Sequence, residues 1–557
     1  MCSRSFVVQR RNAKTLARYN LGETLGSGSF GAVVRATDRI SGAPRAWKAL
    51  QKGKDNDSMF RKEAATMSVL DHPHLCRLFD VIEDQICFYF VMELCEGGDL
   101  QHYLEASSKN QLPEPSVAVL MRQLFGAIHY LHERSMAHSD FAARNILLLK
   151  RTADAPLEQC SAKLADFGSV RSFTAGAAVG PHKGDIWGLG LLMRGLICDI
   201  SRVLGTKSPN RRPLDAQIWA GHSDEARCLC GRLLRRDPES RWTAEEALHH
   251  DWFYVVELPR AEIPGGILQR LRRFVSANVL VRSSLQALAE QREGHEQLFA
   301  DMDQNCDGLL CHNDLFICLT EVGEDVSKED LQQLLQEADP DNIGVVELSC
   351  FKGIMLKEKH TDSKRCLQAA FRIMDRDMDG KISCADLLRI FPSMKRSEAT
   401  AMVAEADMDG DGGINLEEFT AMLRQYFIKP VEATSTWPKP QPSKNESMVK
   451  AKIRALATRT FRTVEYDAES RYSCAMSSYS GVSHLSQLND SDSDDDSAQT
   501  DEPPPSRPAQ SRLPGAPMIT AKVDKAELVR DSEALERAKR ASIQLGLQPQ
   551  VAQIVSL

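Results

Sequence analysis

The hydrophobic pattern divides the chain into four stretches. Between Tyr19 and Phe253, short strand-like runs alternate with helical runs over short connections, which predicts a domain of mixed α and β structure. Within it, Leu21 to Ala36 has the pattern of strand, glycine turn and strand, and Met59 to Leu70 has that of a helix. From Arg292 to Phe427 the pattern of helix, acidic loop and helix occurs four times, with loops that start 36, 36 and 32 residues apart.

An amphipathic segment lies between these two domains. From Ile267 to Gln291 apolar residues recur at helical spacing with arginines among them, which predicts one basic amphipathic helix. The apolar positions are Leu268, Leu271, Phe274, Val275, Val281, Leu285 and Leu288, and the arginines are Arg270, Arg272, Arg273 and Arg282. Calcium-loaded helix-loop-helix pairs bind helices of this kind. The alternative is a helix that packs permanently on the first domain.

The two ends of the chain have biased compositions. Residues 1–18 contain five basic residues and no acidic one, which predicts a solvated basic tail, with a weak contact to anionic lipid as the alternative. Residues 429–557 are rich in Pro, Ser, Thr and Asp and are predicted to be mostly disordered. The predicted domains are therefore 19–253 and 292–428, joined by a junction over 254–291.

Composition narrows the class of protein. The chain has 557 residues, of which 42% are hydrophobic and 26% charged, as in globular proteins with several domains. A net charge of −8 does not favour nucleic-acid binding. No run of 18 apolar residues and no secretory signal is present, so no transmembrane segment is expected. The fifteen cysteines lack zinc-type spacing, which favours reduced thiols and a cytoplasmic location.

The first domain contains a glycine-rich turn followed by a lysine and a glutamate on the next two predicted elements. Gly26, Gly28 and Gly31 would let backbone amides approach phosphates without a Cβ in the way. Lys48 lies on the next strand-like segment, where it would reach the phosphates, and Glu63 lies in the predicted helix, where it would hold Lys48.

A catalytic loop follows along the chain. Asp140 and Asn145 have the spacing of a base for a substrate hydroxyl and a magnesium ligand, and Asp166 before Phe167-Gly168 supplies a second magnesium ligand. Each of these residue types is common on protein surfaces. Their order and separations make the whole set specific for phosphoryl transfer.

With these motifs, Tyr19 to Phe253 resembles the eukaryotic protein kinases. The resemblance implies a bilobal fold with a β-rich N-lobe and a helical C-lobe. It also implies that Met92 to Cys95 forms the hinge, and that Met67, Leu78, His138 and Phe167 form a spine anchored at Asp185. The residues implied to bind the nucleotide are Leu25, Gly26, Ser27, Gly28, Ser29, Phe30, Gly31, Val33, Ala46, Lys48, Glu93, Cys95, Asp99 and Leu147.

The catalytic loop departs from the kinase pattern. Ser139 replaces the Arg that grips a phosphorylated activation loop, so activation by loop phosphorylation is not expected. Ala142 replaces the Lys that meets the γ-phosphate in serine/threonine kinases. Arg144 lies where tyrosine kinases place an Arg, and we interpret it as a substitute cation rather than as a sign of tyrosine specificity.

The activation segment is short. Only 19 positions separate Asp166 from Asp185, and no Ala-Pro-Glu motif lies between them. The missing segment normally supports the substrate peptide, and its Glu pairs with an Arg that matches Arg241. A buried unpaired Arg is costly, so we expect another acid to reach it or the lobe to be loosened. An atypical kinase, a pseudokinase that binds ATP and a skipped exon all fit this sequence.

The acidic loops of the second domain have the ligand pattern of EF-hands, with side-chain oxygens at positions 1, 3, 5 and 12 and a carbonyl at position 7. The last loop satisfies the pattern fully and ends in Glu, whereas the third ends in Asp, whose shorter reach lets magnesium compete. The third loop uses Asp375, Asp377, Asp379, Lys381 and Asp386, and the last uses Asp407, Asp409, Asp411, Gly413 and Glu418.

The first pair of loops is weaker. The first loop offers Asp303, Asn305, Asp307 and Asp314. The loop at Asp339 has Ile343 at position 5 and Cys350 at position 12, so we expect it to keep the fold without holding calcium. The second pair is then expected to bind calcium tightly and the first to act as the graded sensor.

The order of kinase, junction helix and four EF-hands resembles the calcium-dependent protein kinases of plants and protists, over about Tyr19 to Phe427. The resemblance implies that the junction blocks the kinase until calcium makes the EF-hands bind it. The chain is thus predicted to be a calcium-regulated serine/threonine kinase that uses ATP, Mg²⁺ and Ca²⁺ and acts on proteins. A calcium-sensing pseudokinase scaffold is the alternative, and a simple calcium buffer leaves the kinase motifs unexplained.

Overall fold

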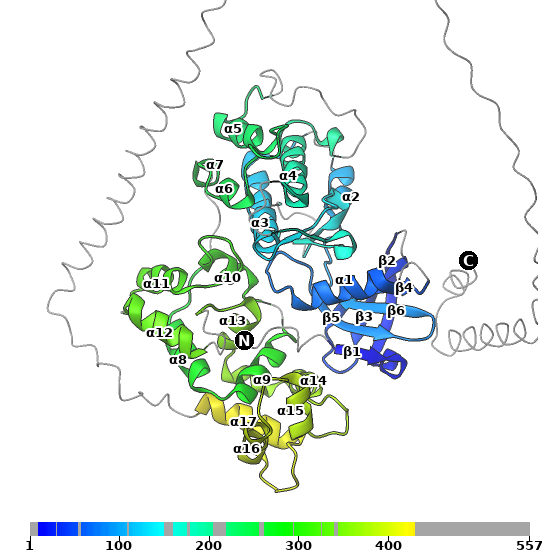
Figure 1. Cartoon of the computed structure of the whole chain (residues 1–557), viewed down its shortest axis with the longest axis vertical. Coiled ribbons are helices and arrows are strands. Elements are labelled where there is room, and N and C mark those ends of the chain that lie inside the picture. Colours follow the sequence, from blue (N-terminus) through cyan, green and yellow to red (C-terminus); the bar gives the residue numbers. More distant parts are fainter. Residues whose placement is uncertain are drawn as a thin grey trace, which may run out of the picture. The chain divides into compact units, whose positions relative to one another are not determined.

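A computed structural model describes most of the chain up to residue 428. The described residues are 9–28, 31–53, 57–107, 111–149, 157, 160–174, 179–203, 219–255, 261–292, 294–324, 326–338 and 344–428. The predicted disordered tail over 429–557 lies outside them. The expected fold class is confirmed: a bilobal kinase fold precedes a helical EF-hand domain (Figure 1).

A six-stranded sheet forms the first lobe, in the order β1-β5-β6-β4-β3-β2. The strands are β1 (Gln9–Asn12), β2 (Tyr19–Gly28), β3 (Gly31–Asp38), β4 (Pro44–Gln51), β5 (Leu78–Glu83) and β6 (Cys87–Met92). Helix α1 (Asp57–Val69) packs on β5 and buries Phe60, Ala64 and Met67 in the core. The ends of β2 and β3 pair at Gly28 and Gly31, so the glycine turn lies at the tip of a hairpin as expected.

The amino-terminal segment corrects one prediction. Instead of belonging to a solvated tail, β1 pairs in parallel with β5, and Ala13–Arg18 forms a 3-10 helix. Arg18 donates to Asp38 at 2.7 and 2.9 Å and to Asp80 at 3.3 Å, and both carboxylates are buried. Burial opposes ionisation of Asp38, but its bonds with Arg18 prevail and lower the pKa of that carboxyl.

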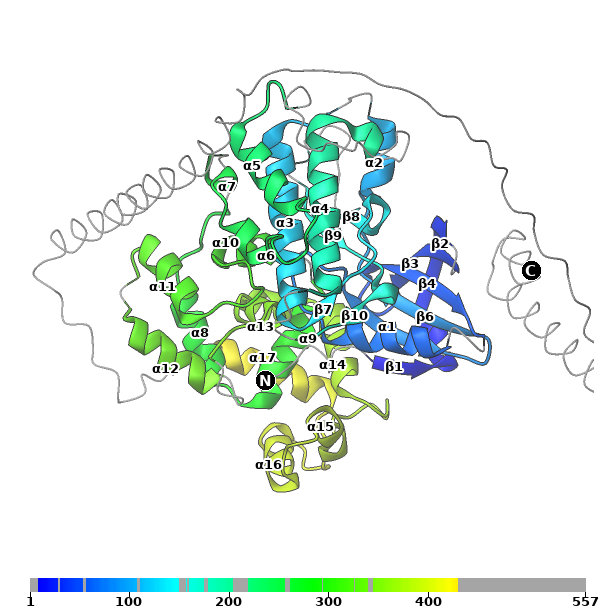
Figure 2. The same cartoon turned by 45° about the horizontal axis from the view of Figure 1, so that its top comes forward.

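Helices form the second lobe. They are α2 (Leu100–Ala106), α3 (Glu114–Glu133), α4 (Pro181–Cys198), α5 (Asp224–Leu233), α6 (Ala244–Leu248) and α7 (Trp252–Val255). Helices α3 and α4 pack side by side at its centre (Figure 2). Two short antiparallel pairs carry the catalytic segments: β7 (Met136–Ala137) with β10 (Arg171–Ser172), and β8 (Ile146–Leu148) with β9 (Ala162–Leu164).

Eight helices of the described residues build the EF-hand domain. They are α10 (Glu296–Met302), α11 (His312–Glu321), α12 (Lys328–Ala338), α13 (Leu348–Ile354), α14 (Lys364–Met374), α15 (Cys384–Ile390), α16 (Arg396–Ala406) and α17 (Leu416–Ile428). Leu310 bridges Val346, and Ile382 bridges Ile414 through two hydrogen bonds of 2.8 and 3.0 Å. These bridges join the loops in two pairs, as EF-hands require.

The junction contains two helices rather than the one that was predicted. They are α8 (Ile267–Ser276) and α9 (Val279–Ala289), and the break falls at Asn278, whose side chain accepts a hydrogen bond from the Val281 N–H and caps α9. Helix α8 packs on α12 and α13, whereas α9 packs on α13, α14 and α17. The apolar residues of both helices belong to the core of the EF-hand domain.

None of the described helices has the length and apolar character needed to cross a membrane. The expected cytoplasmic location and the weak lipid contact stay predictions.

We expect Arg18→Met to lower the free energy of unfolding by about 3 kcal/mol, because it removes the cation that bonds two buried carboxylates. Urea unfolding of the whole chain, followed by tryptophan fluorescence, measures this. The exposed Arg39, which bonds Asn20, provides the matched control Arg39→Met. Because the folded pKa of Asp38 is lowered, its contribution is complete above the unfolded pKa of about 3.9 and is lost as pH falls. The gap between the variant and the wild type should therefore narrow in acid; a gap independent of pH would contradict this assignment.

Candidate functional site

Lys48 and Glu63 lie together beside Asp166. Lys48 Nζ is 3.3 Å from a Glu63 oxygen and 4.0 Å from Asp166 Oδ1. Lys48 lies on strand β4 and Glu63 on helix α1, so the distance between these two side chains depends on how closely α1 packs against the sheet. Glu63 is buried, and burial raises the pKa of its carboxyl although Lys48 opposes the shift. Asp166 has the left-handed backbone angle φ of 66°, which is uncommon outside glycine.

A buried carboxylate orients the catalytic loop. Asp185, near the start of α4, accepts the backbone N–H groups of His138 and Ser139, each at 2.8 Å, and its Oδ2 lies 3.0 Å from His132 Nε2. The ring of His138 contacts the carbonyl of Ala165 at 3.1 Å and lies edge-on to Phe167. The four residues of the expected spine, Met67, Leu78, His138 and Phe167, are all buried.

The side chains of the catalytic loop converge on Asp140. Asn145 Nδ2 donates to the Asp140 carbonyl at 2.8 Å and to its carboxylate at 3.2 Å. Arg144 lies 3.2 Å from the same carboxylate. The predicted substitute cation is therefore paired with the predicted base, and it is exposed enough to turn toward another anion.

The residues predicted to contact adenine lie on strands β3, β4 and β8. Val33 on β3 is opposite Lys48, Ala46 on β4 is opposite Met92, and Leu147 on β8 bridges Asp99. The N–H of Glu93 donates to the Arg77 carbonyl at 2.8 Å, which ties the hinge to β5.

The other residues that are predicted to bind the nucleotide differ in their contacts and exposure. Asp99 accepts the His102 N–H at 2.8 Å and so caps α2. A hydrogen bond with Cys76, together with burial, raises the pKa of the Cys95 thiol well above its ordinary value. Leu25 is half-exposed on β2. Ser29 and Phe30 lie outside the described residues, and Gly26, Ser27, Gly28 and Gly31 all pair in the hairpin ladder.

The structure corrects the expectation for Arg241. Its guanidinium donates to main-chain carbonyls, those of Lys183 at 2.6 Å and Arg235 at 2.9 and 3.1 Å, and stacks over Trp187. Lys183 in turn donates its Nζ to the Arg241 carbonyl at 2.6 Å. No carboxylate is needed, because carbonyl oxygens satisfy the donors that the missing Glu would meet.

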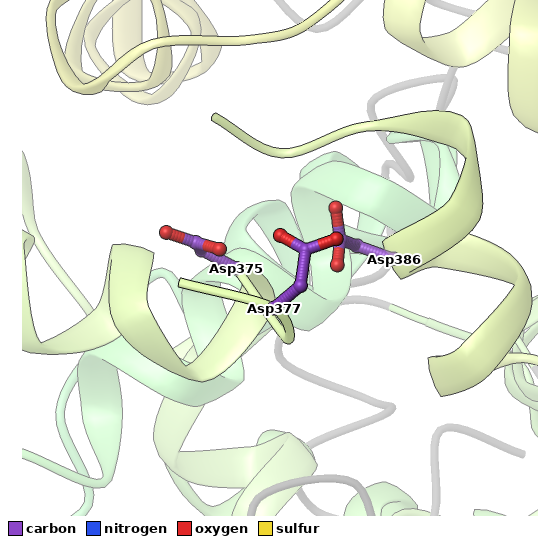
Figure 3. A group of neighbouring side chains, drawn as sticks. All are labelled: Asp375, Asp377 and Asp386. Atoms are coloured by element: carbon purple, nitrogen blue, oxygen red, sulfur yellow. The ribbon is translucent and has the colours of Figure 1, made fainter. Parts of the chain in front are cut away.

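Acidic side chains gather in the last two calcium loops. Ligand oxygens of Asp375, Asp377 and Asp386 lie within 4.8 Å of one another, and Figure 3 shows these carboxylates side by side at the ends of α14 and α15. Asp407, Asp409 and Glu418 form a second such group. Carboxylate clusters of this kind suit calcium, which prefers oxygen ligands. Asp379 accepts the Lys381 N–H at 2.9 Å, and Gly413 donates its N–H to Asp411 at 3.1 Å.

Basic side chains contact acidic residues of both loops. Lys381 Nζ lies 2.5 Å from Asp411, and Arg389 lies 3.4 Å from Asp377 and 3.8 Å from Asp386. The sequence pattern assigned Lys381 only a backbone carbonyl ligand, and the side-chain contact with the neighbouring loop was missed.

In the first acidic loop, all of whose residues are described, the predicted ligand side chains are hydrogen-bonded, but they do not form a close carboxylate group like those of the last two loops. Asp303 accepts the Gly308 N–H at 2.8 Å, Asp314 accepts the Cys311 N–H at 2.9 Å, and Asn305 donates to Asp307 at 2.8 Å. Burial raises the pKa of the Asp303 carboxyl well above its usual range. Of the loop at Asp339, residues 339–343 lie outside the described part, so its expected loss of calcium binding stays a prediction.

A buried ionic cluster that the sequence did not reveal surrounds Arg77. Its guanidinium lies 3.5 Å from Asp71, 3.6 Å from Glu290 and 3.8 Å from Glu296, and Lys352 lies 2.8 Å from Glu296. Burial opposes the charge on Arg77, but the carboxylates prevail and raise its pKa, while the pKa of Glu296 falls to about 2. The cluster joins β5 to the end of the junction and to the first EF-hands.

Comparisons with known proteins agree with this architecture. The protein kinase domain matches residues 19–185, and the EF-hand domain pair matches residues 292–356 and 364–424. Among solved structures, the twitchin kinase region from C. elegans is similar over 46% of this chain and 49% of that chain, with 26% identity and a TM-score of 0.38.

Curated relatives match both domains together. Calcium-dependent protein kinase 17 of Arabidopsis thaliana is 28% identical over 450 residues, which cover 74% of this chain and 85% of that protein. Calcium-dependent protein kinase 3 of Plasmodium berghei is 28% identical over 452 residues, which cover 73% and 80%. A protein kinase domain, two EF-hand pairs and relatives that match about three quarters of this chain support its membership of the calcium-dependent protein kinase family.

Proposed function

We propose that this chain is a calcium-regulated serine/threonine protein kinase that transfers the γ-phosphate of ATP to proteins. The observation that carries the proposal is the pairing of Lys48 with Glu63 beside Asp166, in a chain whose junction helices are packed into its own EF-hands. The relatives' shared name, calcium-dependent protein kinase, supports the same reading.

The residues present fit ATP and magnesium. The glycine hairpin brings backbone amides near the phosphates, and Lys48, held by Glu63, supplies a positive charge. Asp166 and Asn145 offer oxygen ligands of the kind that Mg²⁺ prefers, and the ion would neutralise phosphate charge when bound. Asp140 is the proposed acceptor of the substrate hydroxyl proton. Asn145 holds its backbone and carboxylate in place.

Calcium control is proposed to act through the junction. The apolar residues of α8 and α9, among them Leu271, Phe274 and Leu285, are buried in the EF-hand core, as expected for a junction that the EF-hands have bound. Gly353 of α13 permits close packing, since a Cβ there would lie 3.3 Å from Phe274. We propose that without calcium this core opens and the junction blocks the kinase.

The second candidate function is a calcium-sensing scaffold that binds nucleotide without transferring phosphate. One observation favours it: the segment between Asp166 and Pro181, where α4 begins, is too short to include the usual substrate platform. The intact contacts around Lys48 and Asp140 favour the enzyme.

We expect phosphate transfer from radiolabelled ATP to a basic peptide, and to the chain itself, to depend on calcium. Calcium should raise labelling at least tenfold over chelator, because the junction is released from the kinase. Asp166→Asn serves as the blank, since it removes a magnesium-ligand charge while keeping the size of the side chain.

Two outcomes decide between the candidates. Labelling above the Asp166→Asn blank only with calcium supports the kinase. Absence of labelling, in a preparation that still binds calcium and nucleotide, supports the scaffold and contradicts the enzyme.

We expect Lys381→Met to raise the calcium affinity of the last loop by about two- to fivefold, because an exposed ammonium that competes for Asp411 is removed. Position 7 supplies a backbone carbonyl, so the substitution keeps the ligand set. Calcium titration by calorimetry measures the change. Lys364→Met, at an exposed position of α14, is the matched control, and Glu418→Gln should remove the site. An unchanged titration with Glu418→Gln would place the tight site elsewhere.

A further inference from the structure

The start of the activation segment packs against helix α1. Residues Phe167–Ser169 form a 3-10 turn that contacts α1. A Cβ added at Gly168 would lie 3.5 Å from the Glu63 carboxylate, so Glu63 lies between Lys48 and this turn. The position of α1 therefore depends on the segment as well as on the sheet.

Lys62, beside Glu63 on α1, bonds directly to this segment. Its Nζ donates to the Val170 carbonyl at 3.0 Å. Val170 is 4% exposed and belongs to the core of the kinase lobes, so the carbonyl is fixed in place. A hydrogen bond from a charged donor is stronger than one between neutral groups.

The neighbouring cation on α1 makes a different contact. Arg61 donates to both carboxylate oxygens of Glu83, at 2.8 and 3.2 Å, at the end of β5. Two consecutive side chains thus connect α1 to different parts of the kinase domain. Arg61 connects it to the sheet, and Lys62 connects it to the activation segment.

Unphosphorylated groups also hold residues 171–173 of the segment. Strand β10 pairs with β7, and the Phe173 N–H donates to the Ser135 carbonyl at 3.0 Å. The ring of Phe173 stacks on His182 of α4, with ring centres 4.4 Å apart. Since Ser139 stands where a phosphate-binding Arg would be expected, these contacts take the place of a phosphorylated loop as the anchor of the segment.

We propose that Lys62 is the positioning residue that couples α1 to the activation segment and so keeps Glu63 against Lys48 without phosphorylation. This proposal rests on the proposed kinase function, because its kinetic consequence is the alignment of Lys48 with ATP. Lys62 acts through Glu63 and touches neither the substrate nor the nucleotide in this role.

The test compares Lys62→Met, Lys62→Arg and Arg61→Met in the full chain at saturating calcium. Lys62→Met should lower kcat about fivefold and change the KM for ATP less than twofold, because fewer molecules hold Glu63 on Lys48 while the adenine contacts remain. Lys62→Arg should restore at least half of the loss, since it retains a cationic donor. Arg61→Met should leave kcat within twofold, because the ion pair that it removes is exposed to solvent and contributes little to the position of α1.

Hydrogen exchange followed by mass spectrometry tests the same contact without activity. Peptides that span residues 167–174 should exchange at least threefold faster in Lys62→Met than in the wild type, and at the wild-type rate in Arg61→Met. Equal exchange in Lys62→Met and the wild type overturns the proposal. An equal loss of kcat in Lys62→Met and Arg61→Met also overturns it, because it would show general weakening of α1. If the wild type transfers no phosphate, the kinase function fails and exchange alone decides the role of Lys62.

Discussion

The catalytic loop depends on one buried carboxylate, that of Asp185. It accepts two consecutive backbone N–H groups of the loop and contacts His132 of α3, so it joins helices α3 and α4 to the residues that precede Asp140. Polar oxygens with so little exposure are stable only when they are hydrogen-bonded, and here each oxygen has a donor. The places of Asp140 and of Asn145, which bonds to it, follow from this arrangement.

The regulatory half depends on a different force. The apolar residues of the junction and of the EF-hand helices form one core, so the junction cannot leave the EF-hands without exposing large side chains such as Phe274. The ionic cluster around Arg77 adds little net stability, because the cost of removing its charges from water cancels much of their mutual attraction. It brings Glu290, at the end of α9, beside Arg77, the residue before β5.

The sequence predicted features that depend on local residue patterns. The predicted ATP and calcium residues follow motifs in which the sequence spacing sets the geometry. The structure brings Lys48 close to Glu63 and Asp140 close to Asn145, and it brings three carboxylates together in each of the last two acidic loops. The break in the junction was predictable in principle, since Asn278 before an apolar run is a helix-capping signal, but the apolar spacing continues across it. Strand β1 could not be predicted, because its parallel pairing with β5 uses backbone groups and needs no alternation of side chains. Arg77 and Glu290 are far apart in sequence, so only the tertiary fold reveals their contact.

Arg241 shows why the short activation segment does not disrupt the fold. In the family pattern one segment both binds this Arg and supports the substrate peptide, so its loss predicts damage to stability and to activity together. Here carbonyl oxygens near Arg235 and Lys183 take over the structural task, because a guanidinium is satisfied by any well-placed acceptor. Carbonyl oxygens cannot replace the part of the segment that supports a substrate peptide, because peptide binding requires a surface of matching shape. Stability of the helical lobe and recognition of a peptide are therefore separable in this chain.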